Sequence, residues 1–195
     1  MAKLLGKVAL VTGASRGIGR GSALCLAEEG ADVLVNYRTH ADEAQAVVEA
    51  ITSMGRRAIA YQADVADRAQ VEAMIEATIH RFGRLDIAVA NAARSIREPV
   101  LETDWDTVIK TLSVTQFGVF HTCQLAARQM VAQGRGGKII VISSIHAEQP
   151  FANSAAYNMA KAAINHLAAT MAIELAPYRI NVNAINPGWI DTPGE

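Results

Sequence analysis

The most regular feature of this 195-residue chain is a series of six short apolar runs. Polar or glycine-containing segments bound each run. Continuous apolar runs of this length are typical of strands that are buried on both faces of a sheet. The predicted strands cover 7–12, 31–37, 57–63, 85–90, 138–142 and 179–185.

Segments with amphipathic, helical periodicity separate these runs. Asp67 is placed to cap one of them, glycines end several, and Pro177 ends the last. The predicted helices cover 20–30, 41–54, 67–82, 102–133 and 154–176.

The alternation of strands and helices predicts the fold class. It indicates an α/β fold with a parallel sheet and helices on both faces. Right-handed crossovers leave few topologies, and we expect a doubly wound, Rossmann-type sheet of six strands in the order 3-2-1-4-5-6. No linker, repeat or low-complexity segment divides residues 1–195, so we expect a single dinucleotide-binding domain.

Composition narrows the class of protein. Hydrophobic residues make up 51% of the chain and charged residues 19%, which is typical of a globular domain. The net charge of −1 indicates no attraction to nucleic acid or to an anionic membrane. No run is long enough to span a bilayer, and the N-terminus leads directly into the first strand, so we expect a cytoplasmic protein. Cys25 and Cys123 are expected to be buried free thiols.

The loop after the first strand predicts a dinucleotide site. Glycines at this position let backbone amides approach a pyrophosphate, and the following helix N-terminus favours its negative charge. The spacing G-x-x-x-G-x-G differs from the commoner G-x-G-x-x-G, and a plain glycine turn is the alternative. The candidate cofactor-binding residues here are Gly13, Ser15, Arg16, Gly17, Ile18 and Gly19.

Polar residues also follow the third and fourth strands. Because ligands of such sheets bind at the carboxyl ends of the strands, Asp64 is a candidate partner for the adenine amine and Asn91 for the ribose region. Each residue taken alone is more often part of a turn. Further candidate cofactor contacts are Val65, Ala92, Ala93, Pro187, Gly188, Ile190 and Thr192.

The end of the second strand bears on the choice of cofactor. NAD sites usually carry an acid there, but this strand ends in Asn36-Tyr37-Arg38. Arg16 and Arg38 could pair with a 2′-phosphate, or each could be an ordinary solvated arginine. We expect NADP to be preferred, with NAD possible, and Tyr37 and Arg38 to contact the cofactor.

Tyr157 and Lys161 are the candidate catalytic pair. Their spacing places them on one face of a helix. A free tyrosine has a pKa of about 10, and a nearby ammonium group favours the phenolate. The pair therefore suits general acid/base chemistry beside a hydride carrier, although this motif alone is weak. Ser144, at the end of the fifth strand, could hydrogen-bond the substrate oxygen. His146 is expected at the rim of the site, with a surface position as the favoured interpretation, and no histidine has metal-site spacing.

These motifs together resemble the short-chain dehydrogenase/reductase family. Two stretches, 33–38 and 187–195, look most like those of glucose 1-dehydrogenases and 3-oxoacyl-carrier-protein reductases. The resemblance covers the whole chain, with the motifs in the family's order: 12–19, Asp64-Val65, Asn91-Ala92, Ser144, Tyr157 with Lys161, and 186–188.

The resemblance implies a role for each matching residue. Tyr157 is implied as the acid/base on the carbonyl or alcohol, and Lys161 as the group that lowers its pKa and holds the nicotinamide ribose. Ser144 would orient the substrate, and Asn91 would steady the end of the fourth strand. Homodimers or homotetramers formed through the helices predicted over 102–133 and 154–176 are also implied.

The sequence departs from the family pattern at three places. Ala93 stands where the family usually has glycine. Thr115 stands where an asparagine usually holds a water of the proton relay, with Ser113 as a nearby alternative. Family chains usually continue past the Pro-Gly segment with a helical lid and a seventh strand, and neither is expected in this sequence, which stops at Glu195.

Two functional hypotheses follow. The first is an NAD(P)-dependent oxidoreductase that transfers hydride between nicotinamide and a secondary alcohol or ketone, of sugar or β-keto acyl type. The second is a truncated nucleotide-binding or oligomerising module with little or no turnover. A different reaction on the same fold, such as epimerisation, stays open because a fold does not determine a function.

Overall fold

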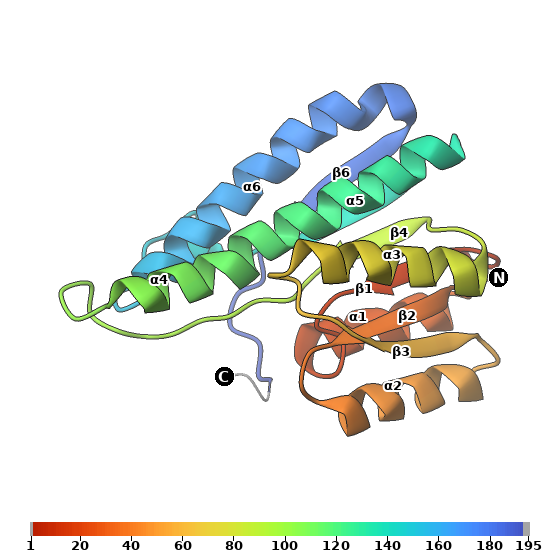
Figure 1. Ribbon diagram of the computed structural model, residues 1–195, viewed down its shortest axis with the longest axis horizontal. Helices are drawn as coiled ribbons and strands as arrows, with labels where there is room; N and C mark the ends of the chain where they lie inside the picture. Colours follow the sequence, from red (N-terminus) through yellow and green to blue (C-terminus); the bar gives the residue numbers. More distant parts are fainter. Residues whose placement is uncertain (1, 193–195) are drawn as a thin grey trace.

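The computed structural model describes residues 2–192 as one parallel sheet with helices on both faces (Figure 1). The six strands lie in the order β3-β2-β1-β4-β5-β6, which confirms the predicted topology. The strands are β1 (Val8–Val11), β2 (Asp32–Tyr37), β3 (Ala58–Gln62), β4 (Ile87–Ala90), β5 (Gly137–Ile142) and β6 (Ile180–Ile185).

The helices alternate with the strands as predicted. The α-helices are α1 (Gly17–Glu28), α2 (Ala41–Ser53), α3 (Arg68–Phe82), α4 (Trp105–Leu112), α5 (Gly118–Gln133) and α6 (Ala155–Leu175). Shorter elements are a π-helical segment η1 (Ser113–Phe117) and the 3-10 turns η2 (Ile145–Ala147) and η3 (Ala176–Tyr178).

Two apolar cores flank the sheet because successive side chains of a buried strand point to opposite faces. In β1, Ala9 and Val11 join one core with side chains of α1 and α2. Val8 and Leu10 join the other core, which α3, α5 and α6 cover. This two-sided burial explains why the strands are continuous apolar runs.

The connection order reverses beside β1, which pairs with both β2 and β4. In doubly wound sheets the two loops that follow such neighbouring strands diverge and leave a crevice at their carboxyl ends. The loops after β1 and β4 are the glycine loop and the segment that begins at Asn91. The topology therefore brings the predicted cofactor motifs together.

The helix predicted over 102–133 begins later and is less regular than expected. Asp104 caps α4, because its carboxylate accepts a hydrogen bond of 2.8 Å from the Thr107 amide. The amides of Glu102 and Thr103 instead donate to the Pro99 carbonyl. The π-helical segment η1 then interrupts the α-helical pattern before α5.

The two cysteines differ in their environments. Cys123 is buried in the core, and this burial raises the pKa of its thiol to about 12. Cys25 is exposed on α1, so the prediction that both thiols are buried is wrong for Cys25. Because α1 contains many small residues, sequence periodicity did not distinguish the solvent face of this helix, where Cys25 lies, from its buried face.

Among residues 2–192, no helix combines the length and the apolar character needed to cross a membrane.

Candidate active site

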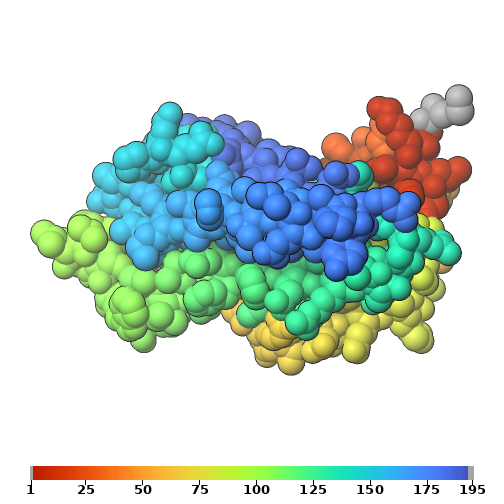
Figure 2. Space-filling view, turned by 90° about the horizontal axis from the view of Figure 1, so that it is seen from above, coloured from red at the N-terminus to blue at the C-terminus, as the bar shows by residue number. Residues whose placement is uncertain are grey.

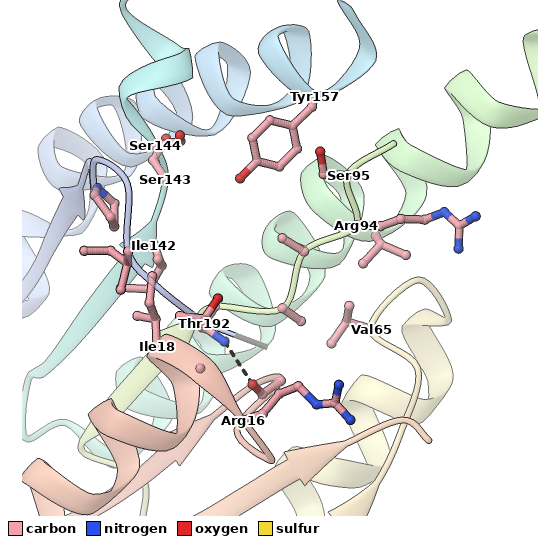
Figure 3. A pocket seen from close by; sticks show the side chains of 18 of the residues that line it. Arg16, Ile18, Val65, Arg94, Ser95, Ile142, Ser143, Ser144, Tyr157 and Thr192 are labelled. Atoms are coloured by element: carbon pink, nitrogen blue, oxygen red, sulfur yellow. Dashed lines mark hydrogen bonds between the residues drawn. The ribbon is translucent and has the colours of Figure 1, made fainter. Parts of the chain in front are cut away.

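A cleft of about 540 Å³ lies at the carboxyl ends of the strands (Figure 3). Its walls come from the glycine loop, the segments after β2, β3, β4 and β6, the end of β5 with η2, and the first turns of α6. The cleft contains every predicted cofactor contact except Gly19, together with Ser144, Tyr157 and Lys161. Residues from all parts of the chain thus meet in one hollow, as the position of the sheet crevice requires.

The glycine loop is shaped by close backbone approaches. A Cβ atom added to Gly19 would lie 2.3 Å from the Gly13 carbonyl oxygen and 2.5 Å from the Asn91 side-chain nitrogen. Gly17 has a φ of 56°, in the left-handed region that favours glycine. The glycines therefore let the loop pack closely against the end of β4, and Gly17 lines the cleft where α1 begins, which suits a pyrophosphate at a helix N-terminus.

Asn91 fastens the end of β4 to the glycine loop. Its side-chain nitrogen donates to the Thr12 carbonyl at 2.9 Å and to the Gly13 carbonyl at 3.1 Å. The Thr12 hydroxyl in turn accepts from the amides of Asn91 and Ala92. Asn91 thus supports the cofactor loop with its amide nitrogen. Ala93, which stands where the family usually has glycine, lies exposed on the cleft wall.

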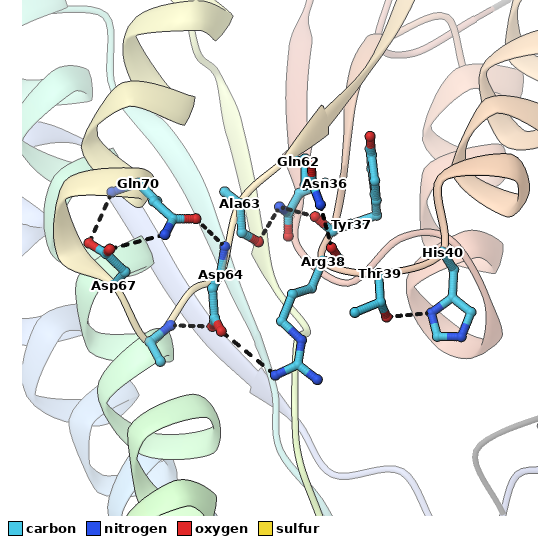
Figure 4. A network of polar contacts seen from close by, with 11 residues as sticks. Asn36, Tyr37, Arg38, Thr39, His40, Gln62, Ala63, Asp64, Asp67 and Gln70 are labelled. Carbon is cyan, nitrogen blue, oxygen red and sulfur yellow. Dashed lines mark hydrogen bonds and ion pairs between the residues drawn. The ribbon is translucent and has the colours of Figure 1, made fainter.

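Asn36 makes a second support that sequence reasoning missed (Figure 4). Its side chain is buried at the end of β2, its oxygen accepts from the Gly13 amide at 3.1 Å, and its nitrogen donates to the Ala63 carbonyl at 3.1 Å. It therefore connects the glycine loop with the segment after β3. An asparagine within an otherwise apolar strand was the signal, because buried amides need partners.

Asp64 and Val65 form the wall after β3. The Asp64 carboxylate accepts from the Ala66 amide at 2.9 Å and lies 3.6 Å from the Arg38 guanidinium (Figure 4). The His121 ring nitrogen Nδ1 donates to the Val65 carbonyl at 3.1 Å, since a carbonyl oxygen only accepts. Both predicted residues line the cleft, and the contact from His121 on α5 fixes the position of Val65.

The two candidate phosphate-binding arginines have different partners. Arg16 makes a bidentate contact with Glu43, with Nε–Oε2 and Nη2–Oε1 distances of 2.9 Å and 2.6 Å. Arg38 makes a longer ion pair of 3.6 Å with Asp64, and its side chain is 53% exposed. Both arginines line the cleft beside Tyr37, Thr39 and His40.

Lys161 is buried beneath the end of the cleft that contains Tyr157. Its side chain is 2% exposed, and its Nζ atom donates to the Ile142 carbonyl at 2.8 Å. Burial lowers the pKa of the ammonium group to about 7. Nζ lies 5.3 Å from the centre of the Tyr157 ring, so the predicted pair meets.

Tyr157 and Ser144 complete this end of the cleft. Figure 3 shows the Tyr157 hydroxyl pointing into the cleft and Ser144 on the facing wall, at the end of β5. The Ser144 hydroxyl oxygen accepts from the His146 amide at 3.2 Å. The Ser143 hydroxyl donates to the Lys161 carbonyl, which fastens the end of β5 to α6.

Thr115 does not reach the cleft. It is fully buried in η1, where its hydroxyl donates to the Arg94 carbonyl and accepts from the Arg94 amide, both at 2.9 Å. Val114 lines the cleft in its place. The structure therefore places the Thr115 side chain behind the loop after β4, where it holds that loop, and not on the cleft wall.

An aromatic cluster that sequence reasoning missed lies beside Tyr157. His146 stacks on Phe151 with ring centres 4.2 Å apart and faces Tyr157 edge-on at 5.2 Å. The Asn158 amide nitrogen donates to the Phe151 carbonyl, so its oxygen, 2.7 Å from His146 Nδ1, accepts the Nδ1 proton. His146 is therefore half-buried in the cleft wall, and its favoured surface position is wrong. Only tertiary packing reveals this environment.

Further cleft residues lie in segments without a recognised motif. Trp189 packs edge-on against Phe151, and the Arg97 guanidinium lies 5.3 Å from the centre of one Trp189 ring. The other cleft residues that sequence reasoning missed include Thr39, His40, Ala63, Arg94, Ser95, Val114, Ile142, Ser143 and Ile145. No group of three or more metal-ligating side chains lies together among residues 2–192.

The family model of short chain dehydrogenases matches residues 7–195. This chain belongs to that family. Its relatives are named oxidoreductases, dehydrogenases and reductases, and the chain is accordingly an oxidoreductase-family enzyme of the type that acts on CH–OH groups. The geometry of the cleft agrees with this membership, because the Tyr157–Lys161 pair and the glycine loop lie at its two ends.

Among its relatives, an uncharacterised oxidoreductase of Methylorubrum extorquens is 42% identical and aligns with 100% of this chain and 77% of its own length. A 3-oxoacyl-[acyl-carrier-protein] reductase of Staphylococcus aureus is 46% identical, and the match covers 94% of this chain and 74% of the reductase. An L-rhamnose 1-dehydrogenase (NAD(P)(+)) of a Sphingomonas species is 39% identical, and the match covers 98% of this chain and 76% of the dehydrogenase.

The fold matches solved structures of the same family. A short chain dehydrogenase of Burkholderia cenocepacia, solved in complex with NADP, superposes with a TM-score of 0.94 at 41% identity, covering 98% of this chain and 78% of that one. A short-chain dehydrogenase/reductase of Mycobacterium marinum superposes with a TM-score of 0.92 at 40% identity, covering 96% and 76%.

Proposed function

We propose that this protein is an oxidoreductase that transfers hydride between NADP(H), used in preference to NAD(H), and a secondary alcohol or its ketone. The observation that carries the proposal is the buried Lys161, which lies beneath Tyr157 in the same cleft as the glycine loop. A cation with no role would not be retained in a buried position at this cost in desolvation.

Tyr157, Lys161 and Ser144 have separate roles in the transfer of the proton. When bound, the nicotinamide dinucleotide supplies or accepts the hydride. Tyr157 donates its phenolic proton to the substrate oxygen during reduction and takes it back during oxidation. Protonated Lys161 stabilises the phenolate, and its near-neutral pKa allows its own proton to exchange at physiological pH. Ser144, on the facing wall, orients the substrate oxygen.

The cofactor would lie along the glycine loop. This loop lines the cleft at the N-terminus of α1, and Asn36 and Asn91 hold its Gly13 in place, which suits a pyrophosphate. Asp64 and Val65 would border the adenine, and the loop after β6 would border the nicotinamide. Arg38 supports the preference for NADP, because it lies at the end of β2 with a weakly held guanidinium group. The NADP complex of the Burkholderia relative supports the same choice.

The substrate would be of sugar or β-keto acyl type. The names of the L-rhamnose dehydrogenase and the 3-oxoacyl reductase relatives suggest these two classes. Beside Tyr157, the cleft wall combines the aromatic rings of His146 and Trp189 with the hydroxyl of Ser95. A wall of this kind accommodates a small molecule with both apolar and hydroxylated faces.

A homodimer or homotetramer formed through the helices of one face is part of the proposal. α5 and α6 lie side by side across the face seen in Figure 2. Exposed apolar side chains on this part of the molecule include Phe117 and Phe120 along η1 and α5, and Met159 and Ile173 on α6. Exposed large apolar groups are typical of surfaces that associate.

Two measurements test the proposed function. Purified protein titrated with NADPH and NADH, followed by the fluorescence of the reduced nicotinamide, should show binding of both nucleotides and tighter binding of NADPH. Turnover is then assayed with a panel of sugars and β-keto esters. Tyr157→Phe should retain nucleotide binding and lose turnover by about a hundredfold or more. Turnover that survives in Tyr157→Phe would contradict the assigned chemistry.

A further inference from the structure

Glu43 forms an ion pair with Arg16, which is one of the two arginines at the cofactor end of the cleft. Its carboxylate accepts both hydrogen bonds of the bidentate contact with Arg16, at 2.9 Å and 2.6 Å. We propose that Glu43 is a specificity-determining residue that weakens the preference for NADPH by competing with its 2′-phosphate for Arg16. This inference rests on the proposed function, since it concerns the cofactor of that same site.

The local structure favours the Arg16–Glu43 contact. Arg16 precedes α1 in the glycine loop, and Glu43 lies in the first turn of α2. A carboxylate in the first turn of a helix is stabilised by the helix dipole, and a bidentate geometry matches the guanidinium fork. Both side chains are partly exposed, at 34% for Arg16 and 46% for Glu43, so a ligand can reach the pair.

The position of the pair connects it with the 2′-hydroxyl end of the cofactor. Arg16 lines the cleft together with Tyr37, Arg38 and Thr39, which follow β2. Dinucleotide folds distinguish NAD from NADP at the end of this strand. A phosphate there would meet two cations. Arg16 is held by a bidentate contact, and Arg38 by a longer ion pair of 3.6 Å.

The charges determine the direction of the effect. A 2′-phosphate that binds Arg16 must displace the Glu43 carboxylate, and the two anions then lie close together and repel each other. NADH carries no phosphate at this position and meets neither penalty. Glu43 therefore lowers the affinity for NADPH without lowering the affinity for NADH, and Arg38 carries most of the phosphate recognition.

The test is the variant Glu43→Gln, which keeps the size of the side chain and removes its charge. Nucleotide fluorescence titrations of the full chain should show NADPH binding about fivefold tighter than in the unmodified protein, with NADH binding unchanged. Glu49→Gln is the matched control, because Glu49 lies on the same helix, where its carboxylate accepts a hydrogen bond from the Gln45 side chain and not from Arg16. It should leave both affinities unchanged.

A double-mutant cycle with Arg16→Gln isolates the competition. Arg16→Gln should weaken NADPH binding only slightly in the unmodified protein and several-fold more in the Glu43→Gln background. An unchanged ratio of NADPH to NADH affinity in Glu43→Gln, or an equal gain for both nucleotides, overturns this inference alone. Failure of the unmodified chain to bind either nucleotide overturns the proposed function and this inference with it.

Discussion

At the scale of single residues, Lys161 is the most informative side chain of the molecule. The sequence motif places it four residues after Tyr157. The structure adds that the ammonium group is buried and has the Ile142 carbonyl as a hydrogen-bond acceptor. Burial explains the direction of its pKa shift, because removing the ammonium group from water disfavours its charged form.

This burial predicts how the stability of the nucleotide-free protein depends on pH. The Lys161 pKa is about 7 in the folded state and 10.5 for the ordinary side chain. Between these values the unfolded chain binds more protons, so the free energy of unfolding should rise with pH, by at most about 1.4 kcal/mol per unit. Urea unfolding at pH 7 and at about pH 8 measures the rise, because a thiol with the ordinary pKa of 9.0 is still largely protonated over this range.

Lys161→Met is the comparison for this measurement, because it fills the same space without a charge. Its free energy of unfolding should rise less between the two pH values than that of the unmodified protein. Cys123, whose raised thiol pKa makes stability fall as the unfolded thiol ionises near its ordinary value of 9.0, is present in both proteins, so its contribution cancels in the comparison. Equal slopes in the two proteins would show that Lys161 is not the titrating group.

At the scale of the elements, the loop after β4 depends on the π-helical segment. The Thr115 hydroxyl satisfies both the amide and the carbonyl of Arg94. One side chain thereby replaces the two hydrogen bonds that a neighbouring strand would otherwise supply. Segments of π-helix often mark functional sites, and here the segment directs a side chain at the back of the cleft wall.

Thr115→Val should therefore destabilise the protein by about 1 to 3 kcal/mol, because it leaves two partly buried backbone groups of Arg94 without a partner. The control is Thr111→Val one turn earlier. The Thr111 hydroxyl is also buried but has no hydrogen-bond partner in the described part of the chain, so its loss should be neutral or stabilising. Chemical unfolding measures the free energy of unfolding of both variants. An equal loss in the two would argue against the role given to Thr115.

The glycine loop allows a second prediction at this scale. Gly19→Ala should abolish nucleotide binding, because the new methyl group would lie 2.3 Å from the Gly13 carbonyl and force the loop to move. Gly21→Ala, in the same helix, meets no atom within 4 Å and should gain up to about 1 kcal/mol of helix propensity. Fluorescence titration measures the first effect and thermal unfolding the second. Tight NADPH binding by Gly19→Ala would refute the proposed placement of the pyrophosphate.

At the scale of the whole molecule, the two faces of the sheet differ in their exposed apolar side chains. Ile173 on α6 is 79% exposed, and Phe120 on α5 is 40% exposed. Ile173→Glu should lower the mass of the associated species, because a charge opposes burial in an interface. Met54→Glu, at the end of α2 on the opposite face, is the control and should leave the mass unchanged. Light scattering after size exclusion distinguishes the outcomes.

Much of the fold could be predicted from local sequence. Each strand lies within two residues of its predicted bounds, and the strand order follows from right-handed crossovers between short apolar runs. The predictions failed where neighbours from distant segments decide the environment. Cys25 faces solvent, and His146 packs against Phe151 and Tyr157, because burial depends on which elements pack together.

The sequence by itself therefore determined the strands and helices, their order in the sheet, and the meeting of Tyr157 with Lys161. Each of these depends on local periodicity, on short spacing or on chain topology. Only the tertiary structure decided how individual polar groups are satisfied. Glu43 contacts Arg16 across 27 positions, and Thr115 contacts Arg94 across 21. A hydrogen bond requires a particular distance and direction between two atoms, and for segments far apart in sequence only packing sets them.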